Sequence, residues 1–301
     1  MLALAGAVAV VVPVAATGSG ARGAARVVAM GSGAHGAAPV AAEPPGRHAA
    51  FARPPAFAAA PGGPRVAAMI VGRGAVLVAP AVVRAPATAV VASGRRCAVG
   101  AGTPLAVLAA VDRAGGPAFR TRDYGSCSRR PRDAGGLFVT EVGGERNRGR
   151  DGWVYKVGPR AGTTSAADPS GPFGDGRVVR SGQRVVWFWC RLASAHRTTT
   201  RFAGGARDSC QRTLQVRAPR RSEPGAALRL RVRGYDDNGR AVDVAGATVH
   251  LQATNEFPPG RAAAVTGADG RATVVLPAAG GSLTAVKEGL VPSFAERVVV
   301  G

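Results

Sequence analysis

The chain has 301 residues, of which 46% are hydrophobic, so it can bury a substantial core. Glycine (43) and proline (22) together exceed one fifth of the sequence, which argues against an all-helical bundle or a coiled coil. The formal net charge is +21, yet only Lys156 and Lys287 among the 39 basic residues are lysine. In a chain so rich in Ala, Gly, Val and Pro, the excess of arginine indicates GC-rich codon usage more than selection for phosphate binding.

The basic charge belongs to the first two thirds of the chain. Residues 1–110 have nine arginines and one acidic residue (+8), and residues 111–221 have 22 basic and nine acidic residues (+13). Residues 222–301 have eight of each sign. Such a field attracts anionic polymers non-specifically and weakens with salt. No nucleic-acid-binding module accompanies it, so we expect no specific nucleic-acid partner.

The amino terminus is typical of a secretory signal. Residues 1–17 are almost wholly apolar through Ala16, with small residues where cleavage would occur. A membrane-associated, uncleaved start is the alternative, but a stretch this short is not expected to span a bilayer. Residues 18–74 are rich in Ala, Gly and Pro without periodicity, and we predict a disordered leader there. The expected location is secreted or extracytoplasmic, free or associated with the cell surface.

Four cysteines agree with export. None forms a CxxC pair, and the lone His196 does not complete a zinc site, so disulfides are expected rather than a metal. Three pairings are possible. We favour Cys97–Cys127 and Cys190–Cys210, because each closes a local loop.

The middle of the chain predicts strands around one helix. The helix is expected to begin at the cap Thr103, with Pro104 in its first turn, and to end at Gly115-Gly116. Strands are predicted at residues 76–83, 88–91, 137–142, 153–157 and 184–190.

This order of elements carries a resemblance. The helix start Thr103-Pro104-Leu105, the strand Leu137-Phe138-Val139 and the run Gly152-Trp153-Val154-Tyr155-Lys156-Val157 are followed by Ser181-Gly182-Gln183. Together they resemble the extracytoplasmic domain of unknown function 4430, which is related to the β-grasp carboxy-terminal domain of transcobalamin. Over residues 75–216 the resemblance implies a secreted β-grasp-like domain. It also names cobalamin as a candidate ligand, a property established only for the transcobalamin branch.

Residues 217–301 are predicted to form an Ig-like β-sandwich, so the expected fold is α+β followed by all-β. Short β runs lie at 228–234, 248–253, 261–265, 272–276, 283–286 and 297–300, with turn signals between them. The strings Gly246-Ala247-Thr248-Val249 and Asp269-Gly270-Arg271-Ala272-Thr273 resemble bacterial Ig-like or carboxypeptidase-regulatory-like modules, which serve as spacers or binding modules. A calcium cluster is the less favoured interpretation of Asp236, Asp237 and Asp243, because acidic turns are mostly solvated.

The sequence contains none of the common catalytic motifs. No nucleophile-elbow, zincin, Walker or dinucleotide-binding pattern occurs, and His196 stands among arginines without a carboxylate to orient it. We therefore expect no enzymatic activity, no catalytic residue, no metal and no cofactor.

The candidate ligand-binding residues are aromatic side chains on two predicted strands, with arginines in the loop beside them: Trp153, Tyr155, Trp187, Trp189, Arg146, Arg148 and Arg150. The aromatic residues either form the core under the helix or present a stacking surface for a planar or sugar-like ligand. Successive side chains of a strand point to opposite faces, so either Trp187 and Trp189 or Val186 and Phe188 pack on the helix, but not both pairs.

These patterns predict a secreted, non-enzymatic ligand- or surface-binding protein whose partner is a small ligand or a cell-wall polymer. The alternative is a structural or adhesive spacer of the cell envelope that associates with anionic wall polymers. Salt separates a charge-driven association from apolar stacking, because screening weakens only the former steeply.

Overall fold

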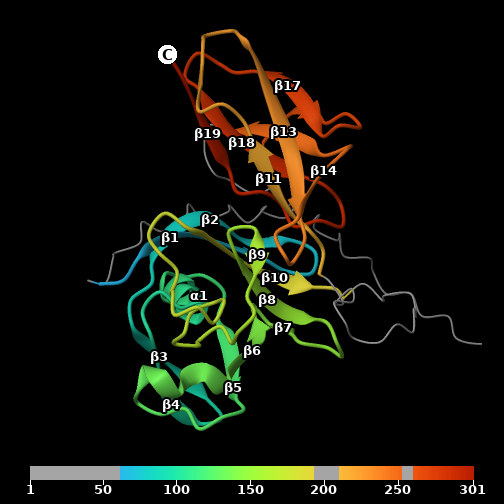
Figure 1. Cartoon of the computed structure of the whole chain (residues 1–301). Helices are drawn as coiled ribbons and strands as arrows, with labels where there is room; N and C mark the ends of the chain where they lie inside the picture. Colours follow the sequence, from blue (N-terminus) through green and yellow to red (C-terminus); the bar gives the residue numbers. More distant parts are fainter. Residues whose placement is uncertain (1–61, 193–209, 253–259) are drawn as a thin grey trace, which may run out of the picture. The chain divides into compact units, whose positions relative to one another are not determined.

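The computed structural model describes residues 62–192, 210–252 and 260–301. All of them lie within one compact unit that spans residues 52–301. The described residues are mostly β, in four sheets, with one α-helix (Figure 1). This confirms the β-rich fold class. The predicted signal (1–17) and most of the predicted leader lie outside the described residues. We call residues 62–192 the α+β part and residues 210–301 the sandwich part.

The first sheet of the α+β part has the order β2-β1-β10-β8-β9. A hairpin joins β1 (Arg65–Val71) to β2 (Val76–Arg84), and β10 (Arg184–Cys190) runs parallel to β1. On its other side β10 pairs antiparallel with β8 (Gly152–Val157), and β9 (Arg160–Ala161) forms the edge. The two segments with the clearest strand patterns in the sequence, β8 and β10, are therefore neighbours.

The position of β1 corrects the sequence analysis, which assigned residues 65–71 to the disordered leader. Val66, Ala68, Met69 and Ile70 are at most 1% exposed and contribute to the core on both faces of the sheet. The local sequence is a weak strand signal because it follows an Ala/Pro-rich stretch. Its partner β10 lies more than one hundred residues away, so a local pattern does not show the pairing.

A second sheet has the order β4-β3-β5-β6-β7. Its strands are β3 (Thr88–Ala92), β4 (Arg95–Val99), β5 (Phe119–Asp123), β6 (Leu137–Val142) and β7 (Glu145–Arg146). The 3-10 helix η1 (Pro131–Gly136) leads into β6. Strands β4 and β5 are not predicted from the sequence, because arginines occupy most of their outward positions and dilute the apolar pattern.

Helix α1 (Pro104–Arg113) begins and ends where the sequence predicted. The Thr103 hydroxyl accepts a hydrogen bond from the Ala106 amide at 3.2 Å, and Gly115 follows the last turn with a φ of 85°. The helix packs against β1, β2, β3 and β10, as Figure 1 shows. Among the described helices, this ten-residue helix and the shorter η1 both fall well below the length needed to cross a bilayer.

The sandwich part consists of two sheets around one core. The first sheet contains β11 (Thr213–Arg217), β13 (Ala227–Tyr235), β14 (Ala241–Asp243) and β17 (Arg271–Val275). The second contains β12 (Arg221–Ser222), β15 (Thr248–Gln252), β16 (Ala262–Val265), β18 (Gly281–Val286) and β19 (Glu296–Val300). Both sheets contribute to the same buried cluster, with Val232 and Leu230 on one side and Val249 and Leu283 on the other.

All six β runs predicted in the sandwich part are strands. The predicted division at residue 217 stays a prediction. Strand β11 ends at Arg217 and pairs with β13, so the last residues before that division belong to the first sheet of the sandwich part.

Candidate functional site

The four candidate aromatic residues lie together, as the strand pattern predicted. Trp187 is the register partner of Tyr155, and Trp189 is the partner of Trp153. The rings of Tyr155 and Trp187 are 5.4 Å apart between centroids, and those of Trp153 and Trp189 are 5.9 Å apart, edge to face. All four residues are between 2% and 7% exposed and belong to the core beneath α1. The open stacking surface is therefore wrong, and the core interpretation holds.

The polar atoms of three of these rings form hydrogen bonds with backbone carbonyls inside the protein. The Trp153 indole donates to the Glu145 carbonyl at 2.7 Å, and the Trp187 indole donates to the Pro104 carbonyl at 3.2 Å. The Tyr155 hydroxyl donates to the Thr164 carbonyl at 3.0 Å. Burial raises the pKa of Tyr155 to about 12. These side chains are positioned for packing, because buried Trp and Tyr stabilise a core only when their polar tips find partners.

Both faces of β10 are covered. The Arg73 guanidinium lies 4.0 Å from the centroid of the Trp189 ring on the side of α1. On the opposite face, Val186 and Phe188 are buried in a cluster with Val291 of the sandwich part. Thus Trp187/Trp189 is the pair that packs on the helix side. Trp153, Tyr155 and Trp187 reach the wall of the cleft described below only with the 2–7% of their surface that is exposed, too little to form a stacking surface.

The three candidate arginines lie between β6 and β8, and each is exposed. Arg146 belongs to the short strand β7, whereas the sequence had predicted a loop there. The Arg146 guanidinium is 2.6 Å from a Glu141 carboxylate oxygen on the adjacent strand β6. The backbone of Arg148 forms a small bridge with Asp151. Arg146 and Arg150 line a cleft beside the sheet, whereas Arg148 is not among the residues that line it.

This cleft has a volume of about 1420 Å³. Its basic side chains are Arg120, Arg146, Arg150, Arg212 and Arg240. Its carboxylates are Glu141, Asp151, Asp236 and Asp237. The lining therefore offers hydrogen-bond donors and acceptors side by side, and both signs of charge.

Two exposed aromatic rings also line the cleft, and the sequence analysis missed them. Tyr124 is 66% exposed and Phe138 is 47% exposed, and their ring centroids are 6.0 Å apart in an edge-to-face arrangement. The Arg122 guanidinium lies 5.0 Å from the Tyr124 ring centroid, and Arg122 is the register partner of Phe138. We call Tyr124 and Phe138 the exposed ring pair. The sequence signal was available: Phe138 is at an outward position between the buried Leu137 and Val139.

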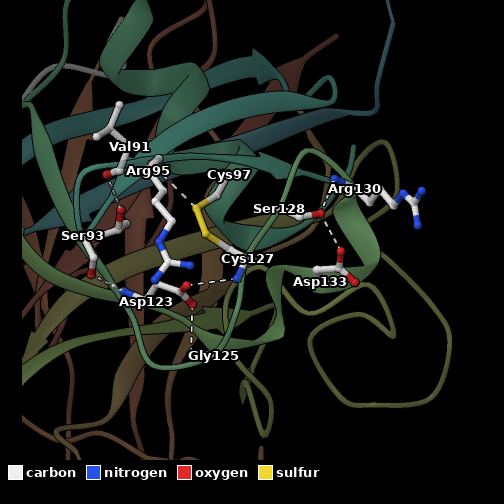
Figure 2. The surroundings of a disulfide bond; sticks show 11 residues. Val91, Ser93, Arg95, Cys97, Asp123, Gly125, Cys127, Ser128, Arg130 and Asp133 are labelled. Carbon is white, nitrogen blue, oxygen red and sulfur yellow. Dashed lines mark hydrogen bonds between the residues drawn. A yellow bond between two sulfur atoms is a disulfide. The ribbon is translucent and has the colours of Figure 1, made fainter.

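The turn that carries Tyr124 is held by the first disulfide (Figure 2). Cys97 of β4 is bonded to Cys127, with 5.4 Å between their Cα atoms. The Asp123 carboxylate accepts from the amides of Gly125 and Cys127, each at 3.0 Å, and Figure 2 shows it facing both. The Tyr124 amide donates to the Gly136 carbonyl at 2.9 Å. The ring is therefore exposed on a fixed backbone.

The second disulfide joins Cys190, the last residue of β10, to Cys210. Both bridges match the favoured pairing, so the predicted disulfides are confirmed. No free cysteine is found among the described residues.

Lys156 is fully buried, and its partner Asp237 lines the cleft. Its ammonium lies 3.1 Å from an Asp237 carboxylate oxygen and donates to the Tyr235 carbonyl at 3.1 Å. Burial lowers the pKa of Lys156, and the Asp237 charge opposes that effect. The other Asp237 oxygen accepts from the Cys210 amide at 2.9 Å. Asp237 is therefore a structural carboxylate that joins β8 to the sandwich part.

The three acidic residues of the possible calcium cluster are bound by amides or basic side chains of the protein. Asp236 accepts from the amides of Asn238 and Arg240 within its own turn, Asp237 pairs with Lys156, and Asp243 pairs with Arg231. No group of three or more metal-ligating side chains occurs within residues 62–192, 210–252 and 260–301. His196 lies outside those residues.

Comparison with known proteins found no family model, no curated protein and no solved structure that matches the chain. The resemblances stated from the sequence stay predictions.

Proposed function

We propose that this chain is an extracytoplasmic, non-enzymatic binding protein whose ligand is an anionic polymer of the cell exterior. The observation that carries the proposal is the outward face of β5, β6 and β7 with the turn after β5, where exposed arginines and two exposed aromatic rings line the same cleft. Arg120 and Arg146 keep 71% and 72% of their side chains exposed although both contact Glu141. Exposed guanidinium groups of this kind bind carboxylate or phosphate at little desolvation cost.

The proposed location rests on the two disulfides, because such bonds persist mainly in oxidising compartments outside the cytoplasm. The sheet order β2-β1-β10-β8, with β1 and β10 parallel at its centre, supports the β-grasp-like domain expected from the sequence. The two sheets of the sandwich part support an Ig-like module in the same way. Cobalamin is not proposed, because the aromatic surface suggested for a planar ligand is closed.

The test is binding of the disulfide-bonded chain to an immobilised polyanion over a salt series. We expect retention at low salt and a steep decrease in affinity between about 50 and 200 mM salt, since counterions are released on binding. A variant with Arg120→Gln and Arg146→Gln should bind more weakly. A variant with Arg229→Gln and Arg271→Gln, exposed arginines of β13 and β17 in the sandwich part, also removes two charges and serves as the matched control. Absence of binding at low salt would contradict the proposal.

A further inference from the structure

The exposed ring pair points to a class of ligand, and this inference rests on the proposed function. Tyr124 and Phe138 are large aromatic side chains. Tyr124 exposes about two thirds of its surface to water, and Phe138 exposes nearly half. Covering such rings with a ligand stabilises the complex, because apolar surface is removed from water. The disulfide and the Asp123 hydrogen bonds fix the Tyr124 backbone in advance, so little conformational entropy is lost on binding.

The geometry of the pair favours contact with one ligand ring over a stack of several. The two aromatic planes are inclined by 68°, so one ring offers its face where the other offers its edge. Arg122 already lies 5.0 Å from the Tyr124 ring, which places a cation beside the same surface. A nucleic-acid strand is instead bound by successive parallel stacking of bases on aromatic faces.

The charges of the cleft discriminate further. Glu141 lies between two arginines, with Arg120 at 3.6 Å and Arg146 at 2.6 Å, and its side chain is 14% exposed. The carboxylates of the lining repel the phosphate groups of DNA or polyphosphate. The backbones of these two polymers have no hydroxyl groups that could donate hydrogen bonds to the carboxylates. A sugar that bears both carboxylate and hydroxyl groups satisfies the arginines and the carboxylates of this lining together.

We propose that the ligand is an acidic polysaccharide whose carboxylated pyranose ring packs on Tyr124 and Phe138, with Arg120 and Arg122 binding its carboxylates. Arg120 and Arg122 are alternate residues of β5, so both side chains project from the outward face that carries Phe138. The rings supply contact with the sugar face and the guanidinium groups supply the recognition of charge.

The experiment measures affinity of the full chain, with both disulfides formed, for polygalacturonate, neutral dextran, polyphosphate and single-stranded DNA. Wild type should bind polygalacturonate most tightly at equal charge concentration and should not bind dextran. Tyr124→Ala and Phe138→Ala should each weaken binding of polygalacturonate by roughly 5- to 10-fold. The control is Val91→Ala, a 69% exposed apolar residue of the same sheet that does not line the cleft, and its affinity should not change.

Each alternative outcome identifies what fails. If wild type binds polygalacturonate but both ring variants bind equally well, the ring pair is not the site, while the proposed function stands. If polyphosphate or DNA binds as tightly as polygalacturonate, the ligand class is wrong. If none of the polyanions binds, the proposed function fails and this inference fails with it. Thermal unfolding of each variant verifies that a lost affinity does not reflect a lost fold.

Discussion

Lys156 Nζ lies 3.1 Å from Asp237 Oδ1 although Lys156 has no exposed surface. In a chain whose only other lysine is Lys287, lysine here supplies a compact cation that reaches from β8 to the Tyr235 carbonyl. The pair connects the α+β part to the turn that lines the cleft. Removal of one partner should therefore affect the stability of both parts.

We expect Lys156→Met to lower the free energy of unfolding by about 1–3 kcal/mol, because it leaves the Asp237 carboxylate partly buried without a counter-ion. The 24% exposure of the Asp237 side chain keeps the loss below that of a fully buried charge. The double variant Lys156→Met/Asp237→Asn should be less destabilised than the sum of the two single changes, as urea unfolding at neutral pH would show. Lys287→Met, at a partly exposed lysine, is the control. Additive effects at positions 156 and 237 would contradict a coupled pair.

Tyr155 predicts a specific response to alkaline pH. Its pKa is raised to about 12 in the folded chain, mainly by burial, from the usual 10.0. The unfolded chain releases this proton first, so stability should fall as pH rises from 10 towards 12, by up to about 2–3 kcal/mol. Tyr155→Phe should lose that part of the pH dependence. The lowered pKa of Lys156 acts with the opposite sign, but both proteins keep Lys156, so the comparison cancels it. Parallel pH profiles would refute the assignment.

The capping residue Thr103 has no exposed surface, and its hydroxyl also donates to the Gly100 carbonyl at 2.9 Å. Thr103→Ala should destabilise the chain by about 1–2 kcal/mol, because the Ala106 amide and the Gly100 carbonyl lose a partner. Thr103→Ser keeps the hydroxyl and should recover most of that loss. Equal stability of the alanine and serine variants in chemical denaturation would show that the cap is unimportant.

The Cys97–Cys127 bridge closes a separation of 30 residues. Its replacement by two alanines should cost about 3–4 kcal/mol in a chain-entropy estimate and should accelerate hydrogen exchange of the backbone amides at positions 124, 125 and 127. Replacement of Cys190 and Cys210, separated by 20 residues, should cost about 3 kcal/mol without affecting the Tyr124 turn. Unchanged exchange in the first variant would mean that other contacts hold the exposed ring.

The sequence predicted those elements whose signals are local. Helix α1 follows its Thr-Pro start and Gly-Gly end, and β6 and β10 match their predicted bounds, because capping and alternation act within a few residues. The parallel pairing of β1 with β10 and the arginine-rich β5 could not be predicted in this way. Both depend on partners that are distant in the sequence.

The candidate site was predicted only in part. Period-two geometry placed the four aromatic residues of β8 and β10 together, but the sequence does not say that α1 and residues near Val291 cover both faces of β10. The exposed ring pair was not predicted as a site, because Tyr124 lies in a turn with no periodic pattern. Phe138 is exposed although its neighbours Leu137 and Val139 are buried. A single apolar side chain on the outward face of a strand is common in proteins and does not by itself indicate a binding site.

The most direct measurement is hydrogen–deuterium exchange of the full chain with and without polygalacturonate at low salt. Binding at the cleft predicts protection of peptides that cover residues 119–126 and 137–150, with little change in β13, β17 and β19. Protection confined to the sandwich part, or spread evenly over all basic segments, would contradict a site built from the outward face of β5, β6 and β7.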